Sequence, residues 1–404
     1  MATPAPLEVL IFRHADDSDV DQYQESILRA LQGGRDVRNY LATGEDLGIQ
    51  IEVFKGPPAL GAAEVLDSFC HTVTVVLADR ALLENGSDPL WDWLADCWNH
   101  TSASNGRHAV LVVALDERVG SAFLGKRADF ANLQLLQVHS LGEPAIRPAM
   151  FSLLLLHECR VRLSEALIPS LGFDAGHLKL FISHAKMDGL PLARALKIQI
   201  GELAWLPKFY DADDLPPGSD WQAELEKSVG ASLIVILRTE EYDNRHWCQQ
   251  EVLWADEYAT PAVLVDARTS LNHPAGTLPL ERVPTVRIPD GNLLRILFLA
   301  LREGLRFLHF MRRVEEMKRS GACPFPVELR VFSFQPSMTA LLRACRKLAD
   351  STQAVDVPRL ILYPDPPLRV GAYEAANALV SSYGPPGTRL VTPNTLAATK
   401  GATS

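Results

Sequence analysis

Two kinds of hydrophobic pattern alternate along the chain. Short apolar runs rich in β-branched residues, such as "EVLIF" from Glu8 and "TVTVVLA" from Thr72, predict buried strands. Between them, segments such as "DQYQESILRALQ" from Asp21 carry apolar residues at intervals of three and four and end at glycine, which is typical of helices. Continuous apolar strands that alternate with helices predict α/β domains, with parallel sheets covered by helices on both faces.

The same order of patterns occurs twice. "LKLFISHAKMDG" from Leu178 parallels "VLIFRHADD" from Val9, and "LIVILRTEEYDN" from Leu233 parallels "VTVVLADRALLEN" from Val73. We interpret the repeat as a tandem duplication of one flavodoxin-like, doubly wound unit. The alternative is that all doubly wound α/β domains share such a pattern without a common duplication.

The pattern predicts four parts. We expect an α/β domain with a trailing helix at 1–170 and a second α/β domain at 177–290. A connecting helix follows at 291–320, and a smaller βαβαβ piece occupies 325–398. This piece is either an incomplete third unit or a small docking domain.

Matching segments of the two units carry tryptophans with the same spacing. "HWCQQEVLW" ends at Trp254, and "WDWLADCW" in the first unit has Ala95 where the later segment has Glu251. On a helix Trp247, Glu251 and Trp254 share one face, so an acid flanked by rings could bind a flat, positively charged group. The alternative is that both tryptophans are core anchors and Glu251 is a solvated helix residue.

Composition narrows the classes of function. The net charge of −10 gives no field that attracts nucleic acid. Six cysteines without a CxxC pair argue against a zinc site and a disulfide framework, and favour a reducing compartment. The N-terminal sequence lacks the features of a signal peptide, and no apolar run reaches the ~18–20 residues of a membrane span. We therefore expect a cytoplasmic protein that binds neither membrane nor nucleic acid directly.

Residues Leu178 to about Ile288 resemble Toll/interleukin-1 receptor (TIR) domains, of the bacterial NAD+-cleaving type. The segment "LKLFISHAKMDG" is similar to the first box of that family. "FYDADDLPPGSDWQAELEKSVGASLIVILRTEEYDNRHWCQQEVLWA" resembles its second-strand loop and its Trp-Cys signature, in which a glutamate follows two residues after the cysteine. The resemblance implies a five-stranded parallel sheet with helices on both faces.

The resemblance also implies a site. Some TIR domains only assemble into scaffolds, whereas others cleave NAD+ between nicotinamide and ribose. Glu251 matches the catalytic acid of the enzymatic members. The residues expected to bind the substrate are Trp247 at the pocket, Phe181, Ser183 and His184 from the first strand, and Asp211, Leu215 and Gly218 in a mobile loop.

We therefore expect an NAD+ glycohydrolase that uses NAD+ as substrate, without a metal or a cofactor. Nicotinamide departs as a neutral group, so one carboxylate suffices where ordinary glycosidases need two. The sequence leaves open whether the product is ADP-ribose or a cyclised isomer. The resemblance implies homo-oligomers formed through TIR–TIR contacts, an activating ligand or protein, and a role in prokaryotic antiviral or cell-suicide immunity.

Other interpretations remain open at this stage. A non-enzymatic adaptor would use both α/β units as binding surfaces. A deoxyribosyltransferase-like enzyme shares the fold and the single acid. The first unit, with Ala95, is expected to be a degenerate TIR-like domain without activity, or else an unrelated flavodoxin-like domain.

Overall fold

The structure is a computed structural model. It describes residues 5–14, 18–33, 46–164, 179–203, 221–269, 280, 283–288, 292–321, 328–350 and 358–401. The chain divides into two compact units, Met1–Ile168 and Pro169–Ser404, and each is described by itself. Within the described ranges, no helix combines the length and the apolar character that crossing a bilayer requires.

Unit 1 is built on a parallel sheet whose strands follow the order β2-β1-β3-β4-β5. This reversal after the first strand is the flavodoxin-like order. The strands are β1 (Glu8–Phe12), β2 (Gln50–Phe54), β3 (Thr72–Ala78), β4 (His108–Ala114) and β5 (Leu135–Gln137). The main helices are α1 (Ser18–Gln32), α2 (Ala62–Asp67), α3 (Arg80–Asn85), α4 (Asp88–Ala103), α5 (Glu117–Leu124) and α6 (Arg147–Ser164).

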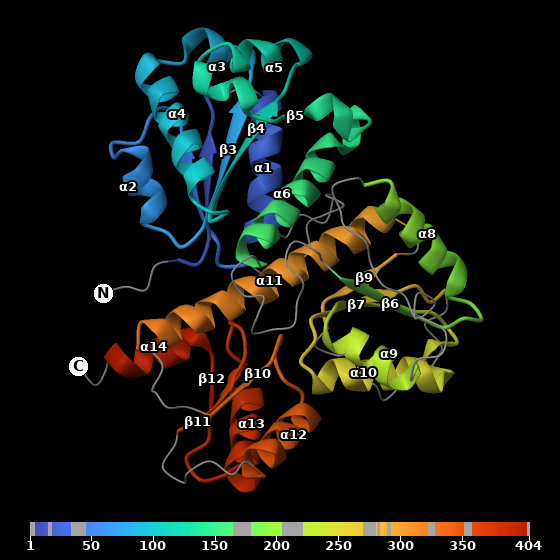
Figure 1. The fold of residues 1–404 in the computed structure, drawn as a ribbon. Coiled ribbons are helices and arrows are strands. Elements are labelled where there is room, and N and C mark those ends of the chain that lie inside the picture. The colour runs from blue at the N-terminus through green and yellow to red at the C-terminus, as the bar shows by residue number, and fades with distance from the viewer. Residues whose placement is uncertain are drawn as a thin grey trace. The chain divides into compact units, whose positions relative to one another are not determined.

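Helices cover both faces of this sheet. Helices α1 and α6 pack together on one side, and α2 and α4 pack on the other (Figure 1). All seven residues of β3 are buried, as expected for a central strand between two helical layers. The predicted class, mixed α/β with parallel sheets, is confirmed.

One residue of β1 departs from this apolar pattern. Glu8 is only 1% exposed, and neither of its carboxylate oxygens has a hydrogen-bond partner in the described part of the chain. Burial, and then the nearby charge of Glu52, raise the pKa of Glu8 to about 7. The first strand therefore begins with an acid that loses its proton only near neutral pH.

Unit 2 begins with a second parallel sheet, whose described strands follow the order β6-β7-β8-β9. They are β6 (Leu180–His184), β7 (Leu233–Arg238), β8 (Ala262–Asp266) and β9 (Thr285–Arg287). The resemblance implies a fifth strand, which we expect in "LPKFYDAD" from Leu206, but this segment lies outside the described residues. The helices are α8 (Leu190–Gly201), α9 (Trp221–Gly230), α10 (His246–Glu257) and the long α11 (Leu293–Arg319).

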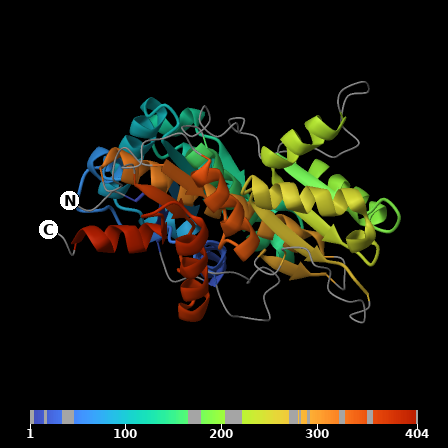
Figure 2. The same ribbon diagram turned by 90° about the horizontal axis from the view of Figure 1, so that it is seen from below.

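The helices of this part also form two layers. Helices α9 and α10 lie side by side over one face of the sheet, as both views show (Figure 1 and Figure 2). On the other face, α11 contacts β7, β8 and α8. Helix α11 is buried along most of its length, which explains why its sequence is apolar although charges interrupt it.

The remainder of unit 2 contains a third parallel sheet, of order β10-β11-β12. Its elements are β10 (Glu328–Val331), α12 (Met338–Ala349), β11 (Arg359–Leu362), α13 (Val370–Tyr383), β12 (Arg389–Val391) and α14 (Pro393–Gly401). The alternation matches the predicted βαβαβ piece. Arg343 of α12 pairs with the buried Asp256 of α10 at 3.2 Å, and Lys347 pairs with Glu257 at 3.0 Å. This piece therefore contacts the end of α10.

Candidate functional site

A pocket opens where β6 ends and α10 begins. Its volume is about 620 Å³, within the range of small-molecule sites. It lies beyond the carboxyl end of a parallel strand, where ligands bind in open α/β sheets. The lining residues are Ile182, His184, Ala185, Lys186, Met187, Trp221, Arg245, His246, Trp247, Cys248 and Glu251.

Glu251 is the only acid among these lining residues. Its side chain lies in the pocket wall and is 6% exposed. Oε2 of Glu251 accepts a hydrogen bond from Oγ of Ser183, which comes from the neighbouring strand β6. The interpretation of Glu251 as a fully solvated helix residue is therefore wrong, because the packing of α10 on the sheet removes it from bulk water.

The hydrogen bond to Glu251 belongs to a short chain of hydroxyl groups. Ser183 Oγ also lies 2.5 Å from the hydroxyl of Tyr242, which is completely buried. Serine has one proton, and Ser183 donates it to Glu251, so Ser183 can only accept from Tyr242, whose hydroxyl also lies 3.4 Å from the carbonyl oxygen of Cys248. Burial and the charge of Glu251 raise the pKa of Tyr242 well above its usual value, which keeps the phenol protonated as a donor. The chain therefore holds the carboxylate in one position.

Cys248 lines the same pocket but is a poor nucleophile. It is 4% exposed. Burial, and then the charge of Glu251, raise the pKa of its thiol to about 12. A neutral thiol is much less nucleophilic than a thiolate. The thiol of Cys248 is therefore not a candidate nucleophile, and Glu251 is the acidic group among the lining residues.

Two tryptophans form one wall of the pocket. Trp247 is 39% exposed and Trp221 is 38% exposed, and their ring centroids lie 4.5 Å apart in an edge-to-face arrangement. Trp254, one turn beyond Glu251, is instead buried in the core at 5% exposure. The prediction that Trp247 and Trp254 both flank Glu251 at a binding site is therefore only half right. Trp247 faces the pocket with Trp221, whereas Trp254 packs against the sheet.

The pocket also carries basic and imidazole groups. Lys186, Arg245 and His246 are among its lining residues. His184, at the end of β6, is 9% exposed. Its Nδ1 lies 3.5 Å from the carbonyl of Ile182, and its buried Nε2 has no hydrogen-bond partner among the described residues. These groups offer hydrogen bonds and positive charge to a polar ligand.

The turn that follows β6 is closely packed. A Cβ at Gly189 would lie 2.9 Å from the carbonyl oxygen of Ala185, so a larger residue would displace the backbone. Asp188 then accepts hydrogen bonds from Oγ1 of Thr239 at 2.7 Å and from the backbone N–H of Glu241 at 3.0 Å. The loop beside the pocket is thereby fixed to the loop that leaves β7.

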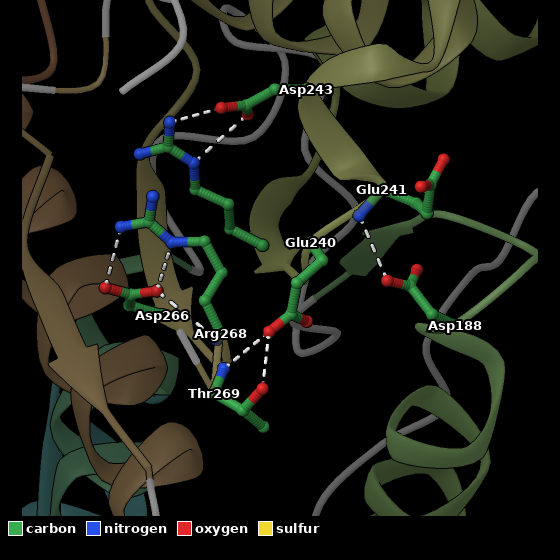
Figure 3. A network of polar contacts seen from close by, with 8 residues as sticks. Asp188, Glu240, Glu241, Asp243, Asp266, Arg268 and Thr269 are labelled. Carbon is green, nitrogen blue, oxygen red and sulfur yellow. Dashed lines mark hydrogen bonds and ion pairs between the residues drawn. The ribbon is translucent and has the colours of Figure 1, made fainter. Parts of the chain in front are cut away.

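A network of polar contacts extends this connection to the segment after β8, where the backbone N–H and the hydroxyl of Thr269 each donate to Glu240 at 2.7 Å (Figure 3). Arg238, at the end of β7, donates to Asp243. Arg268 forms two parallel hydrogen bonds with Asp266, at 2.8 and 3.0 Å. These bonds, and then the charge of Arg268, hold the pKa of Asp266 below its usual range. Charge-assisted pairs of this geometry are rigid, so the loops at this edge of the sheet form a firm support for the pocket.

The structure brings together four of the predicted site residues. Ser183, His184, Trp247 and Glu251 lie at the pocket or bond to a residue that lines it. Phe181 was expected to line the pocket, but it is 1% exposed and packs in the core with Val252 of α10. The predicted loop residues Asp211, Leu215 and Gly218 lie outside the described residues.

Sequence reasoning did not identify Trp221, Arg245 or Tyr242. Trp221 is the first residue of α9 and follows the sequence "PPGSD" directly, and this position beside the predicted pocket loop was a usable signal. Arg245 precedes the first residue of α10. Tyr242 had no signal of its own, since its role depends on Ser183, which is distant in sequence.

The helix of unit 1 with the same tryptophan spacing, α4, offers a contrast. α4 carries Ala95, which is 7% exposed and lies in the hydrophobic core. Trp91 and Trp93 are also buried, and each donates its indole N–H to a backbone carbonyl, of Gly86 and of Leu60. The tryptophans of this helix therefore serve packing.

A comparison with protein-family models matches part of the chain. Residues 180–286 match the TIR domain family. The matched segment covers β6 to β9, and therefore includes the Glu251 pocket. A search of curated proteins found no match to the chain.

The search of solved structures adds little. One similar structure is the C-terminal domain of glucosamine-fructose-6-phosphate aminotransferase from Francisella tularensis, which is 9% identical in sequence. The alignment covers 76% of this chain and 85% of that chain, with a TM-score of 0.19. A score this low supports no argument about fold or function. The match to the TIR family model is therefore the informative comparison.

Proposed function

We propose that the TIR domain of this chain is an NAD+ glycohydrolase that breaks the bond between nicotinamide and ribose. The observation that carries the proposal is the single buried carboxylate of Glu251, held by Ser183 in the wall of a pocket beside Trp247. TIR domains include NAD+-cleaving members and scaffolding members. A partly desolvated acid next to exposed aromatic rings supports the enzymatic alternative.

The proposed reaction needs one acid. The bond from the nicotinamide nitrogen to the ribose C1′ breaks, the electron pair stays with nitrogen, and nicotinamide leaves as a neutral molecule. The sugar becomes a cation, which the negative charge of Glu251 stabilises. Water then adds to C1′ and releases one proton, which gives ADP-ribose. Addition of an adenine nitrogen in place of water would give the cyclised isomer.

The other groups of the pocket suit parts of the same substrate. The rings of Trp221 and Trp247 offer an apolar wall for a planar cationic ring. Lys186 and Arg245 offer positive charge to the two phosphates. His184 offers the unpartnered Nε2 to a ribose hydroxyl. The pocket thus has groups that suit the ring, the sugar and the diphosphate.

We further propose that the activity depends on assembly through TIR–TIR contacts and on an activating ligand or protein. The proposed context is prokaryotic antiviral or cell-suicide immunity. This part rests on the family match alone, and a rise in specific activity with protein concentration would support it.

The test compares the parent chain with Glu251→Gln, which keeps the shape of the side chain but removes its charge. Glu224→Gln is the matched control, because Glu224 is a carboxylate on the adjacent helix α9 and does not line the pocket. Nicotinamide release from NAD+ and fluorescence from its etheno analogue are measured at several protein concentrations. We expect at least ~100-fold lower turnover in Glu251→Gln and unchanged turnover in the control.

Two results would count against the proposal. Equal turnover in the parent and in Glu251→Gln would remove Glu251 from the mechanism. Absence of nicotinamide release from an assembled parent chain would favour the adaptor. The deoxyribosyltransferase alternative is tested by replacing NAD+ with deoxynucleosides. Cleavage of the deoxynucleosides would favour that alternative, because an NAD+ glycohydrolase would not cleave them.

A further inference from the structure

Unit 1 contains a cluster of potential metal ligands that the sequence did not reveal. Asp67 ends α2, His100 lies near the end of α4, and His108 begins β4. One ligand atom from each of the three lies within 4.8 Å of the other two. Nε2 of His100 is 3.3 Å from Oδ1 of Asp67. Zinc–ligand bonds of about 2.0–2.1 Å at tetrahedral angles separate two ligand atoms by about 3.3 Å, so this pair already has the required spacing.

His108 provides independent evidence for a ligand. It is 2% exposed, and its Nε2 is buried without a hydrogen-bond partner among the residues that the structure describes. Nδ1 of the same ring lies 3.0 Å from Oγ1 of Thr72. When Nδ1 donates its proton to Thr72, Nε2 carries a lone pair, as in metal sites where a second group fixes the histidine tautomer.

The surroundings leave the cluster accessible. The side chain of Asp67 is 52% exposed and that of His100 is 29% exposed, so an ion can reach both from solvent. Arg107 is the nearest competing cation, with Nη1 3.8 Å from Oδ1 of Asp67. The guanidinium of Arg107 also donates to the carbonyls of Phe69 and Cys70. Arg107 thus has other partners and is 49% exposed, so a bound ion need not displace it.

We propose that Asp67, His100 and His108 form a binding site for a divalent transition metal of the zinc type. Two imidazoles and one carboxylate are ligands that zinc accepts, and calcium and magnesium prefer sites made of oxygen. Three protein ligands leave a fourth position for water. The ligands come from α2, α4 and β4, so the ion cross-links two helices to the sheet and stabilises unit 1.

The experiment uses the full chain after dialysis against a chelator. Zinc binding is measured by calorimetry in the parent and in three variants, Asp67→Asn, His100→Ala and His139→Ala. His139 is the matched control, because it is an exposed histidine of the same unit outside the cluster. The buried His108 is left intact, since its replacement could unfold the unit.

We expect one zinc ion per chain in the parent and in His139→Ala. Asp67→Asn and His100→Ala should each bind at least about tenfold more weakly. Zinc should also raise the melting temperature of the parent and of His139→Ala more than that of the other two. Absence of binding in the parent, or equal affinity in all four proteins, would overturn the proposal.

Cobalt(II) identifies the donor atoms. Binding at this site should give the visible absorption of a cobalt ion bound by nitrogen and oxygen, weakened in His100→Ala. A sulfur-to-cobalt charge-transfer band would show that cysteine binds the metal, and would also overturn the proposal. Cys70 makes this control necessary, because it is a partly exposed thiol of the same unit.

Discussion

Ser183 donates a hydrogen bond to Oε2 of Glu251, although 68 positions separate the two residues in the chain. Strand β6 supplies the hydroxyl and helix α10 supplies the acid, and the packing of α10 on the sheet brings them together. The hydroxyl of Tyr242 contacts Oγ of Ser183 in turn. The carboxylate therefore has a fixed position in the pocket wall before any ligand arrives.

Ser183→Ala should lower the turnover of NAD+ without unfolding the domain. A hydrogen bond to a charged group contributes ~1.5–3 kcal/mol, so its loss from the transition state should reduce kcat about tenfold or more. Ser232→Ala is the control, because the buried Ser232 bonds only to a backbone carbonyl of α9. Steady-state nicotinamide release gives kcat and KM for both. A kcat for Ser183→Ala equal to that of the parent would contradict the positioning role.

Trp247→Ala should weaken substrate binding, whereas Trp254→Ala should weaken the fold. Trp247 is exposed to the pocket, so its loss should raise KM and leave the melting temperature almost unchanged. Trp254 is buried, so its loss should reduce the free energy of unfolding by about 3–5 kcal/mol. Kinetics and thermal unfolding of both variants check this contrast. A large loss of stability in Trp247→Ala would instead make it a packing residue.

Cys248 should be inert to alkylation although it lines the pocket. With a thiol pKa of about 12, roughly one molecule in ten thousand carries the thiolate at pH 8. Iodoacetamide treatment of the native chain, followed by peptide mass mapping, should label Cys70 well before Cys248. Cys248→Ala should keep most of the activity. Rapid labelling of Cys248 that blocks turnover would show a reactive nucleophile.

Glu8 should make the stability of unit 1 depend on pH. Its native pKa of about 7 is raised above the ordinary 4.5, so the protonated form favours the folded state. This contribution is complete below pH 4.5 and is lost as the pH rises through 7. Glu8→Gln mimics the protonated acid. The variant should therefore be more stable than the parent at pH 8, by at most about 3 kcal/mol, and the difference should vanish near pH 4.5.

Denaturant unfolding of the parent and of Glu8→Gln at several pH values measures the difference in their free energies of unfolding. The buried His108 and His157 have pKa values lowered to about 4, and they make stability rise with pH between about 4 and 6.5. Both proteins contain these histidines, so their effect cancels in the comparison. A constant difference between parent and variant across the pH range would contradict the assignment to Glu8.

Part of the candidate site could be read from the sequence. The Trp-Cys signature with its glutamate singled out Glu251 and Trp247, and the apolar run with "ISHA" singled out Ser183 and His184. Phe181 was misplaced because it shares with Ser183 the face of β6 that packs under α10, but it lies two residues farther from the carboxyl end of the strand and is buried in the core. The partner of Trp247 was Trp221 from another helix, which helical spacing within one segment cannot reveal.

The sequence by itself determined the alternation of buried strands and helices, since local hydrophobic period and turn residues depend on neighbours along the chain. It therefore determined the α/β class and the position of the acid on a helix. Only the tertiary structure decided that Ser183 bonds to Glu251, that Trp254 enters the core, and that Asp67, His100 and His108 meet. Those contacts join residues far apart in the chain, and they depend on how helices pack on a sheet, which no local pattern specifies.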